Sequence, residues 1–131
     1  GLDAVGRNQV YDTFCMVRDQ YRVGFIVITH DLLLARKFCE RIVVMYCGRV
    51  LETNAARELF EHPRHPYTQG LIASLPHLGM KPMAGFSPAF TDQPSGCVFH
   101  PRCPYAEARC RHTEPKSIPC GEGSVCCHRY A

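Results

Sequence analysis

Cysteine is the residue type in this sequence with the clearest chemistry. Six of the nine cysteines lie between residues 97 and 127. Thiolates are soft ligands that suit zinc or iron–sulfur clusters. Structural zinc sites usually contain close cysteine pairs, whereas five and six residues separate Cys97, Cys103 and Cys110. The wider spacing favours a four-cysteine iron–sulfur cluster, with zinc or reduced, unbound thiols as the alternatives.

Other cysteines and histidines in the sequence have simpler interpretations. Cys15, Cys39 and Cys47 are scattered and are expected to be small buried apolar residues. Histidine is often a partly exposed polar residue, so surface positions are favoured over metal binding for His100, His112 and His128. Two prolines, Pro63 and Pro66, interrupt the segment that contains His62, His65 and Tyr67. These three residues are therefore expected to end a helix and pack a turn.

His30 is the second candidate for chemistry, because it directly follows an apolar, β-branched run at residues 25–29. Such a run predicts a buried strand of a parallel sheet. A histidine at the carboxyl end of that strand lies where α/β sheets bind ligands, and its imidazole could donate a hydrogen bond to a phosphate oxygen or an attacking water. Taken alone, however, this position is more often structural.

The elements that would position these residues alternate between helix and strand. Helical spacing predicts a helix over residues 8–21, and Asp31 can cap a second one over residues 32–39. A strand over residues 41–46 and a return strand over 49–52 are joined by Cys47-Gly48, typical of a tight turn. Shorter helices are expected over residues 55–61, capped by Thr53 or Asn54, and over 68–74.

The rest of the chain is irregular. Residues 77–95 lack periodicity and are rich in proline and glycine, so they indicate a linker. The cysteine-rich tail from Gly96 has few large apolar residues, and a bound metal centre could supply the missing cross-links. Fifteen Lys and Arg residues against twelve Asp and Glu residues give a mixed charge, which does not suggest a nucleic-acid partner. No apolar run approaches the length of a membrane span.

Several stretches in order resemble one known family. Residues 26–32 (Ile-Val-Ile-Thr-His-Asp-Leu) resemble the switch-histidine segment of ABC ATPases, residues 43–52 the hairpin that follows it, and Gly1-Leu2-Asp3 the end of the D-loop. Residues 58–68 and 96–105 resemble the segments that mark the oligopeptide, dipeptide and nickel importer branch. The sequence is thus similar to the C-terminal part of an ABC transporter ATP-binding subunit.

The resemblance implies roles for particular residues. His30 would contact the γ-phosphate and position the hydrolytic water, and Asp3 would couple two nucleotide sites across a dimer. Some members of the branch carry a [4Fe–4S] cluster, whose matching ligands here are Cys97, Cys103, Cys110 and Cys127. Cys126 and Cys120 remain alternatives for the fourth ligand.

The resemblance also implies cofactors and partners. The intact protein would bind ATP and Mg²⁺ on the cytoplasmic side of the cell membrane, as a peripheral subunit. Its partners would be a second, homologous ATP-binding subunit, two transmembrane permease subunits and, indirectly, an extracytoplasmic solute-binding protein. Peptides, nickel and glycoside-derived solutes all remain open as cargo.

The expected fold class is α/β, the C-terminal part of an ABC-type P-loop ATPase domain followed by a small cysteine-rich extension. Residues 1–61 would belong to the nucleotide-binding domain, 62–95 to a helix and linker, and 96–131 to the extension. The sequence contains no Gly-x-x-x-x-Gly-Lys-Ser/Thr phosphate loop, so the isolated chain is expected not to hydrolyse ATP. A metal-stabilised binding or redox-sensing module, or a decayed gene fragment, is the alternative.

Overall fold

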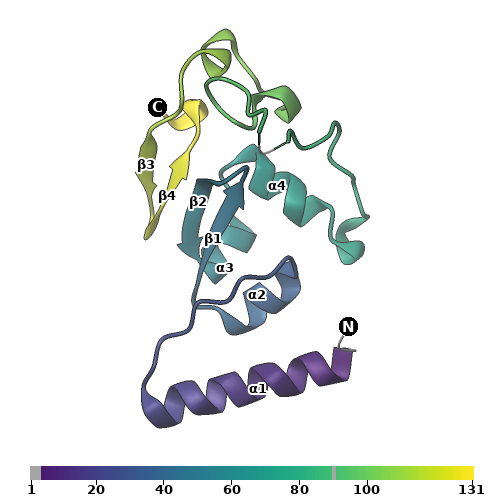
Figure 1. Ribbon diagram of the computed structural model, residues 1–131, viewed down its shortest axis with the longest axis vertical. Helices are drawn as coiled ribbons and strands as arrows, with labels where there is room; N and C mark the ends of the chain where they lie inside the picture. Colours follow the sequence, from purple (N-terminus) through teal and green to yellow (C-terminus); the bar gives the residue numbers. More distant parts are fainter. Residues whose placement is uncertain (1–3, 90) are drawn as a thin grey trace. The chain divides into compact units, whose positions relative to one another are not determined.

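The computed structural model describes residues 4–89 and 91–131, and the chain divides into two compact units. The first unit ends at Cys39, and the second begins at Glu40. Figure 1 shows helices throughout and one four-stranded sheet, so the predicted α/β content is confirmed. Within residues 4–89 and 91–131, no helix is both long enough and apolar enough to cross a membrane.

The first unit contains two helices joined by an irregular segment. α1 spans Ala4–Tyr21 and α2 spans Leu32–Phe38, which confirms both predicted helices. The Asp31 carboxylate accepts a hydrogen bond from an amide in the first turn of α2 at 3.1 Å, so the predicted cap is also confirmed. Tyr11 of α1 stacks on Phe38 of α2, with 4.8 Å between the ring centroids.

The buried strand predicted at residues 25–29 is not formed, so this prediction was wrong. Residues 23–29 have no regular structure, and Ile26 and Ile28 are 96% and 97% exposed. A parallel strand needs hydrogen-bonding neighbours, and every strand pairing among the described residues lies in the second unit. Phe25 instead packs near α1, with its ring centroid 5.6 Å from that of Phe14.

A β-hairpin opens the second unit. β1 (Arg41–Tyr46) pairs antiparallel with β2 (Arg49–Ala55), which confirms the predicted hairpin and extends its return strand. Cys47 and Gly48 have φ angles of 47° and 75°, and a type I′ turn requires positive φ at both central residues. The register shifts after Val44, which leaves Leu51 as the extra residue of a β-bulge.

A second hairpin continues the same sheet. β3 (Ser117–Cys120) and β4 (Gly123–Cys126) extend it in the order β1-β2-β4-β3, antiparallel throughout (Figure 1). β4 joins β2 through two residue pairs, Glu52 with Val125 and Thr53 with Ser124. Gly123 permits this approach, because a Cβ atom there would overlap the carbonyl oxygen of Thr53. The cysteine-rich tail is therefore joined to the first hairpin by main-chain pairing.

Two short helices follow β2. α3 spans Ala56–Glu61, but its N-cap is Ala55 and no side chain caps it, so the predicted cap by Thr53 or Asn54 was wrong. Both residues lie inside β2, which pairing with β4 helps to extend. α4 spans Pro66–Ala73 and confirms the last predicted helix with an earlier start. Proline is well suited to the first helical position, because its missing N–H would have no partner there.

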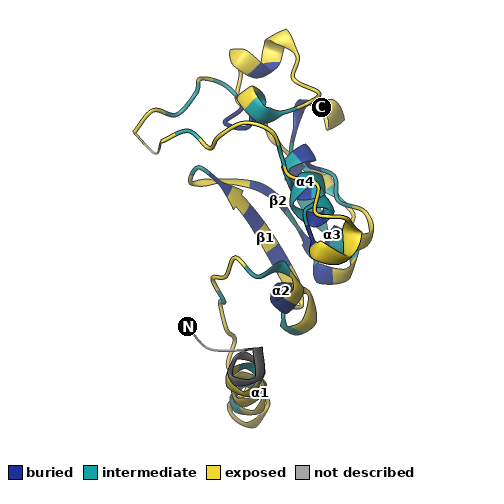
Figure 2. Ribbon diagram, turned by 90° about the vertical axis from the view of Figure 1, so that its right-hand side faces the viewer, coloured by how far each residue is buried: buried dark blue, intermediate teal, exposed yellow. Residues whose placement is uncertain are grey.

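Residues 96–131 share a core with the hairpin and α4. Phe99 is 1% exposed and packs against the rings of Tyr46 and Tyr67 at centroid distances of 5.4 and 5.3 Å. Figure 2 shows the buried residues of β1 and β2 in dark blue. The tail is therefore held to the hairpin by apolar packing. This core consists of Tyr46, Leu51, Cys97, Val98, Phe99 and Cys110.

The linker over residues 77–95 is irregular after a single 3₁₀ turn, η1 (Pro76–Leu78). It is nevertheless tethered by hydrogen bonds to other parts of the second unit. The Arg102 side chain donates to the Ala84 carbonyl at 3.0 Å and to the Ser87 hydroxyl at 3.1 Å. Gln93 donates to the Cys47 carbonyl of the hairpin turn at 3.0 Å. The predicted absence of periodic structure is confirmed for the described part of this segment.

Candidate functional site

Four cysteines from separate turns line one small cavity in the second unit. Cys97 and Cys103 flank η2 (His100–Arg102), Cys110 lies in η3 (Ala108–Arg111), and Cys127 lies between β4 and η4 (His128–Tyr130). The cavity has a volume of about 20 Å³, which is enough for one water molecule. The structure therefore brings together the four cysteines that the family resemblance singled out.

Backbone and arginine contacts hold these turns together. The Cys97 amide donates to the Cys110 carbonyl at 2.9 Å, and Gly96, at φ 69°, lets that carbonyl approach closely. The Arg109 guanidinium donates to the His128 carbonyl at 2.7 Å. The His128 ring contacts the Thr113 carbonyl through Nε2 at 2.8 Å. The turns are thus held in place by hydrogen bonds that do not involve the thiols.

The thiols themselves lie in an environment that opposes ionisation. Burial raises the pKa of Cys97, Cys103 and Cys127, and the neighbouring thiolates raise it further. Hydrogen bonds from backbone amides two residues along the chain lower the pKa in all three cases; the donors are Phe99, Tyr105 and Arg129. N–H groups aimed at sulfur stabilise thiolates that bind metal, whereas burial favours the protonated thiols of Cys97, Cys103 and Cys127.

The other two cysteines of the tail lie elsewhere. Cys126 lines a different cavity, and neither Cys126 nor Cys120 lines the cavity of the four cysteines. Over residues 4–89 and 91–131, no three His, Cys, Asp or Glu side chains are grouped so that they could hold a single metal ion. The four thiols therefore surround a common space without forming a ready-made site for one ion.

His65 also lines this cavity, although the sequence predicted only that it would end a helix and pack a turn. It is 1% exposed, lines the cavity with the cysteines and packs edge-on against Phe99. Its Nδ1 accepts a hydrogen bond from the Tyr67 amide at 3.0 Å and so caps α4. Because Nδ1 is an acceptor, the neutral ring carries its proton on Nε2.

Glu52 supports this turn and was missed in the sequence. The side chain is fully buried, and its two carboxylate oxygens accept hydrogen bonds from the Arg64 amide at 2.8 Å and the His65 amide at 2.9 Å. Arg64 and His65 lie between two prolines, where no regular helix can satisfy their N–H groups. That arrangement indicates the need for an acceptor but not which residue supplies it.

Burial of His65 predicts a pH-dependent stability. Desolvation lowers its pKa from 6.5 to about 4, so the unfolded chain binds a proton more readily than the folded one. Stability is therefore fully present above pH 6.5 and is lost as the pH falls towards 4, by up to about 3 kcal/mol. Urea unfolding between those pH values, followed through signals from residues 40–131, measures the change.

The matched variant for this test is His65→Asn, because asparagine keeps a capping oxygen but does not titrate. The variant should lose most of the pH dependence in that range while remaining folded at neutral pH. An unchanged pH profile in His65→Asn would assign the acid sensitivity to another group.

The two residues assigned to nucleotide chemistry are His30 and Asp3. His30 is exposed and directly precedes the capping residue Asp31 of α2. Asp3 lies outside the described residues. The roles of His30 and Asp3 therefore stay predictions from the family resemblance.

The comparisons with known proteins agree with the motifs. A sequence model of the family described as "Oligopeptide/dipeptide transporter, C-terminal region" matches residues 51–110. The dipeptide transport ATP-binding protein DppD of Haemophilus influenzae is 38% identical over 132 residues, covering 97% of this chain and 40% of the relative. DppD of Escherichia coli K12 is 39% identical over 119 residues, covering 87% and 36%. DppD of Caldanaerobacter subterraneus is 35% identical over 135 residues, covering 98% and 41%.

These relatives are ATP-binding proteins of dipeptide transport, and the matching family model describes the C-terminal region of such transporters. The chain belongs to the oligopeptide/dipeptide transporter family and corresponds to the C-terminal part of such a subunit. It spans about two fifths of the length of the relatives that it matches.

Proposed function

We propose that this chain is the C-terminal part of an energy-coupling subunit that uses ATP and Mg²⁺ to drive the import of peptides or related solutes. The observation that carries the proposal is the 38% identity to a dipeptide transport ATP-binding protein over 97% of the chain. In the longer protein, a Gly-rich loop would hold the phosphates, and His30 would help to position the attacking water. Asp3 would link the two nucleotide sites of a dimer.

The proposed organisation follows from the same resemblance. Residues 1–61 complete the nucleotide-binding domain, residues 62–95 form a helix and linker, and residues 96–131 form the cysteine-rich extension. The subunit pairs with a second ATP-binding subunit against two transmembrane permeases at the cytoplasmic face of the membrane. A solute-binding protein outside the membrane delivers the cargo. The isolated 131 residues, which lack the phosphate loop, are inactive.

A chimeric transporter tests the proposal. The matching C-terminal region of Escherichia coli DppD is replaced by this chain, and ATP hydrolysis and dipeptide uptake are measured with its partner subunits. We expect both activities to be retained. His30→Ala should lower ATP hydrolysis by about 100-fold or more while leaving ATP binding intact, because it removes a group that stabilises charge in the transition state.

The control for the chimera is His77→Ala, which changes another exposed histidine, in the 3₁₀ turn η1. It should leave ATP hydrolysis unchanged. A folded, assembled chimera whose ATP hydrolysis is insensitive to His30→Ala would contradict the role proposed for this residue. ATP turnover by the isolated chain would contradict the proposal that it lacks a complete site.

For the cysteine cavity, we propose a [4Fe–4S] cluster held by Cys97, Cys103, Cys110 and Cys127. Four soft ligands around one space and three N–H groups directed at sulfur support it. Among residues 4–89 and 91–131, no three His, Cys, Asp or Glu side chains are grouped for a single metal ion, so neither zinc nor a cluster finds its ligands already in place. Because the cavity holds about one water molecule, cluster binding requires the thiols to move apart. Iron and acid-labile sulfide in the purified chain test this assignment.

The bound cluster would supply cross-links between turns that are distant in sequence. That role is structural, and it concerns residues 96–131 rather than ATP hydrolysis. A redox-sensing role is the second candidate, because the same thiols would make cluster occupancy sensitive to oxidation.

A further inference from the structure

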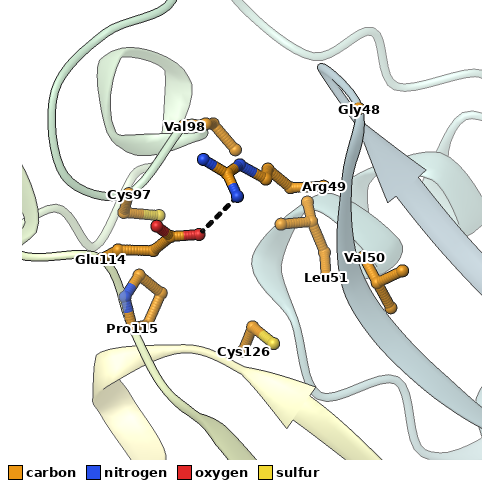
Figure 3. A pocket seen from close by; sticks show the side chains of 9 residues that line it. All are labelled: Gly48, Arg49, Val50, Leu51, Cys97, Val98, Glu114, Pro115 and Cys126. Carbon is orange, nitrogen blue, oxygen red and sulfur yellow. Dashed lines mark ion pairs between the residues drawn. The ribbon is translucent and has the colours of Figure 1, made fainter.

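A larger cavity in the second unit shares Cys97 with the cavity of the four cysteines, but its other lining residues have no part in the proposed ATP or metal chemistry. It has a volume of about 280 Å³ and lies between β2, β4 and the segments that precede η2 and β3 (Figure 3). Small-molecule sites begin at about 300 Å³, so this space suits only a small ligand. The residues that line it are Gly48, Arg49, Val50, Leu51, Cys97, Val98, Glu114, Pro115 and Cys126.

The cavity exists because the sheet opens at this point. β2 and β4 pair only at Glu52 with Val125 and Thr53 with Ser124. Continuing that register would place Leu51 opposite Cys126, but the ladder stops, and both residues line the cavity instead. Residues 49–51 therefore present a stretch of β2 edge that β4 does not cover. Such an edge offers main-chain hydrogen-bonding groups to a peptide-like ligand.

Opposite charges face each other across this space. The Arg49 guanidinium points towards the Glu114 carboxylate in Figure 3, with Nη1 and Oε1 3.4 Å apart. Their side chains are 55% and 58% exposed. Close charge-assisted hydrogen bonds are about 2.7–2.9 Å long, and an exposed pair contributes only about 0–1 kcal/mol. A ligand can therefore separate the two side chains at little cost.

We propose that this cavity binds a small zwitterion, an amino acid or dipeptide with a free carboxylate and a free ammonium group. The carboxylate pairs with Arg49, whose planar guanidinium suits two-point contact, and the ammonium group pairs with Glu114. Val98 and Pro115 provide apolar contacts for the side chain of the ligand. A nucleotide would require a larger space and would meet the Glu114 carboxylate.

Binding of L-alanyl-L-leucine to the 131-residue chain, followed by NMR, tests the proposal. Shifts are expected for residues 49–51, 97–98, 114–115 and 126. The dipeptide should also slow alkylation of the Cys126 thiol, which lines the cavity but is not a proposed cluster ligand. The N-acetylated dipeptide and the dipeptide amide each lack one charge, and both should bind more weakly, by up to about fivefold.

Variants of Arg49 and Glu114 test which side chain binds the carboxylate and which binds the ammonium group of the ligand. Arg49→Gln should weaken dipeptide binding by up to about fivefold and remove the preference for a free carboxylate, and Glu114→Gln should do the same for the free ammonium group. Arg57→Gln, which breaks the exposed Arg57–Glu61 pair of α3, should leave binding unchanged. No binding up to about 10 mM, equal binding of the blocked dipeptides, or an equal loss in the control overturns the proposal.

The test is independent of the proposed transport function. It needs neither ATP nor partner subunits, so a failed chimera would not remove dipeptide binding by the isolated chain. Conversely, an active chimera whose isolated chain binds no dipeptide would overturn only the inference about this cavity.

Discussion

Glu52→Ala is expected to lower the unfolding free energy of residues 40–131 by about 3–5 kcal/mol. The substitution leaves the amides of Arg64 and His65 without their acceptors in a fully buried place. It also leaves a cavity, because the Glu52 side chain is fully buried. The cavity lies beside β2, the strand that joins the two hairpins through the pairing of Glu52 with Val125 of β4.

Urea titration followed by NMR signals from residues 40–131 measures this loss without a contribution from the first unit. Glu61→Ala is the matched control, because it removes an equally charged side chain from an exposed pair with Arg57. We expect the control to change the unfolding free energy by less than about 0.5–1 kcal/mol. Similar losses in both variants would show that the buried carboxylate has no special role.

Glu52→Gln distinguishes the contribution of the Glu52 hydrogen bonds to stability from the contribution of its side-chain volume. The amide keeps one acceptor oxygen but turns an NH₂ group towards the second backbone N–H, so one of the two donors loses its partner. The expected loss is smaller than for alanine, about 1–3 kcal/mol. If glutamine destabilised as much as alanine, the negative charge would matter more than the two hydrogen bonds.

Local features of the sequence predicted the local structure well. The Cys47-Gly48 turn requires two positive φ angles, and the chain provides glycine at one of them. Asp31 caps the residues that immediately follow it. In both cases the interacting groups are within a few residues of each other, so the sequence pattern contains the information.

Predictions that depended on distant partners were less successful. The apolar run at residues 25–29 has the composition of a buried strand, but a strand also needs a neighbour, which composition does not supply. Thr53 was expected to cap a helix, yet pairing with Ser124 keeps it in β2. Glu52 and its amide partners are 12 and 13 residues apart, and no local pattern links them.

The candidate site shows the same division. The family resemblance implied a ligand set, and the structure places those four cysteines around one cavity. The second cavity was not predicted, because Arg49 and Glu114 are separated by most of the second unit and meet only where the sheet opens. His65 was expected in a turn, and only the packing of Phe99 and the cysteines shows that it also lines the thiol cavity.

Cys103→Ser is expected to abolish retention of the proposed cluster. The unchanged chain, loaded with iron and sulfide in the absence of oxygen, should contain about four iron atoms per molecule. The iron content of the variant should be lower by a factor of about ten or more. Cys103 is only partly buried, so serine there should leave the fold of residues 40–131 intact. Iron, sulfide and zinc analysis together with the visible absorption spectrum measures the outcome.

Cys126→Ser and Cys120→Ser are the matched controls, because both change a cysteine of the same tail that does not line the cavity. They should retain iron as the unchanged chain does. Loss of iron in either variant would show that the assigned ligand set is wrong, and stoichiometric zinc without iron would replace the cluster altogether.

The large effect expected from one thiol follows from the positions of all four. They lie on separate turns, so the cluster would close loops between residues 97, 103, 110 and 127, and its binding free energy would add to the stability of these turns. Burial raises the pKa of Cys97, Cys103 and Cys127, so loading must release protons and should be favoured by higher pH. With Cys103 replaced, the remaining three thiols would face the same burial cost with one fewer bond to the cluster. Reduced stability of the loaded Cys103→Ser variant, with unchanged stability in the unloaded state, would therefore separate loss of the cluster from damage to the fold.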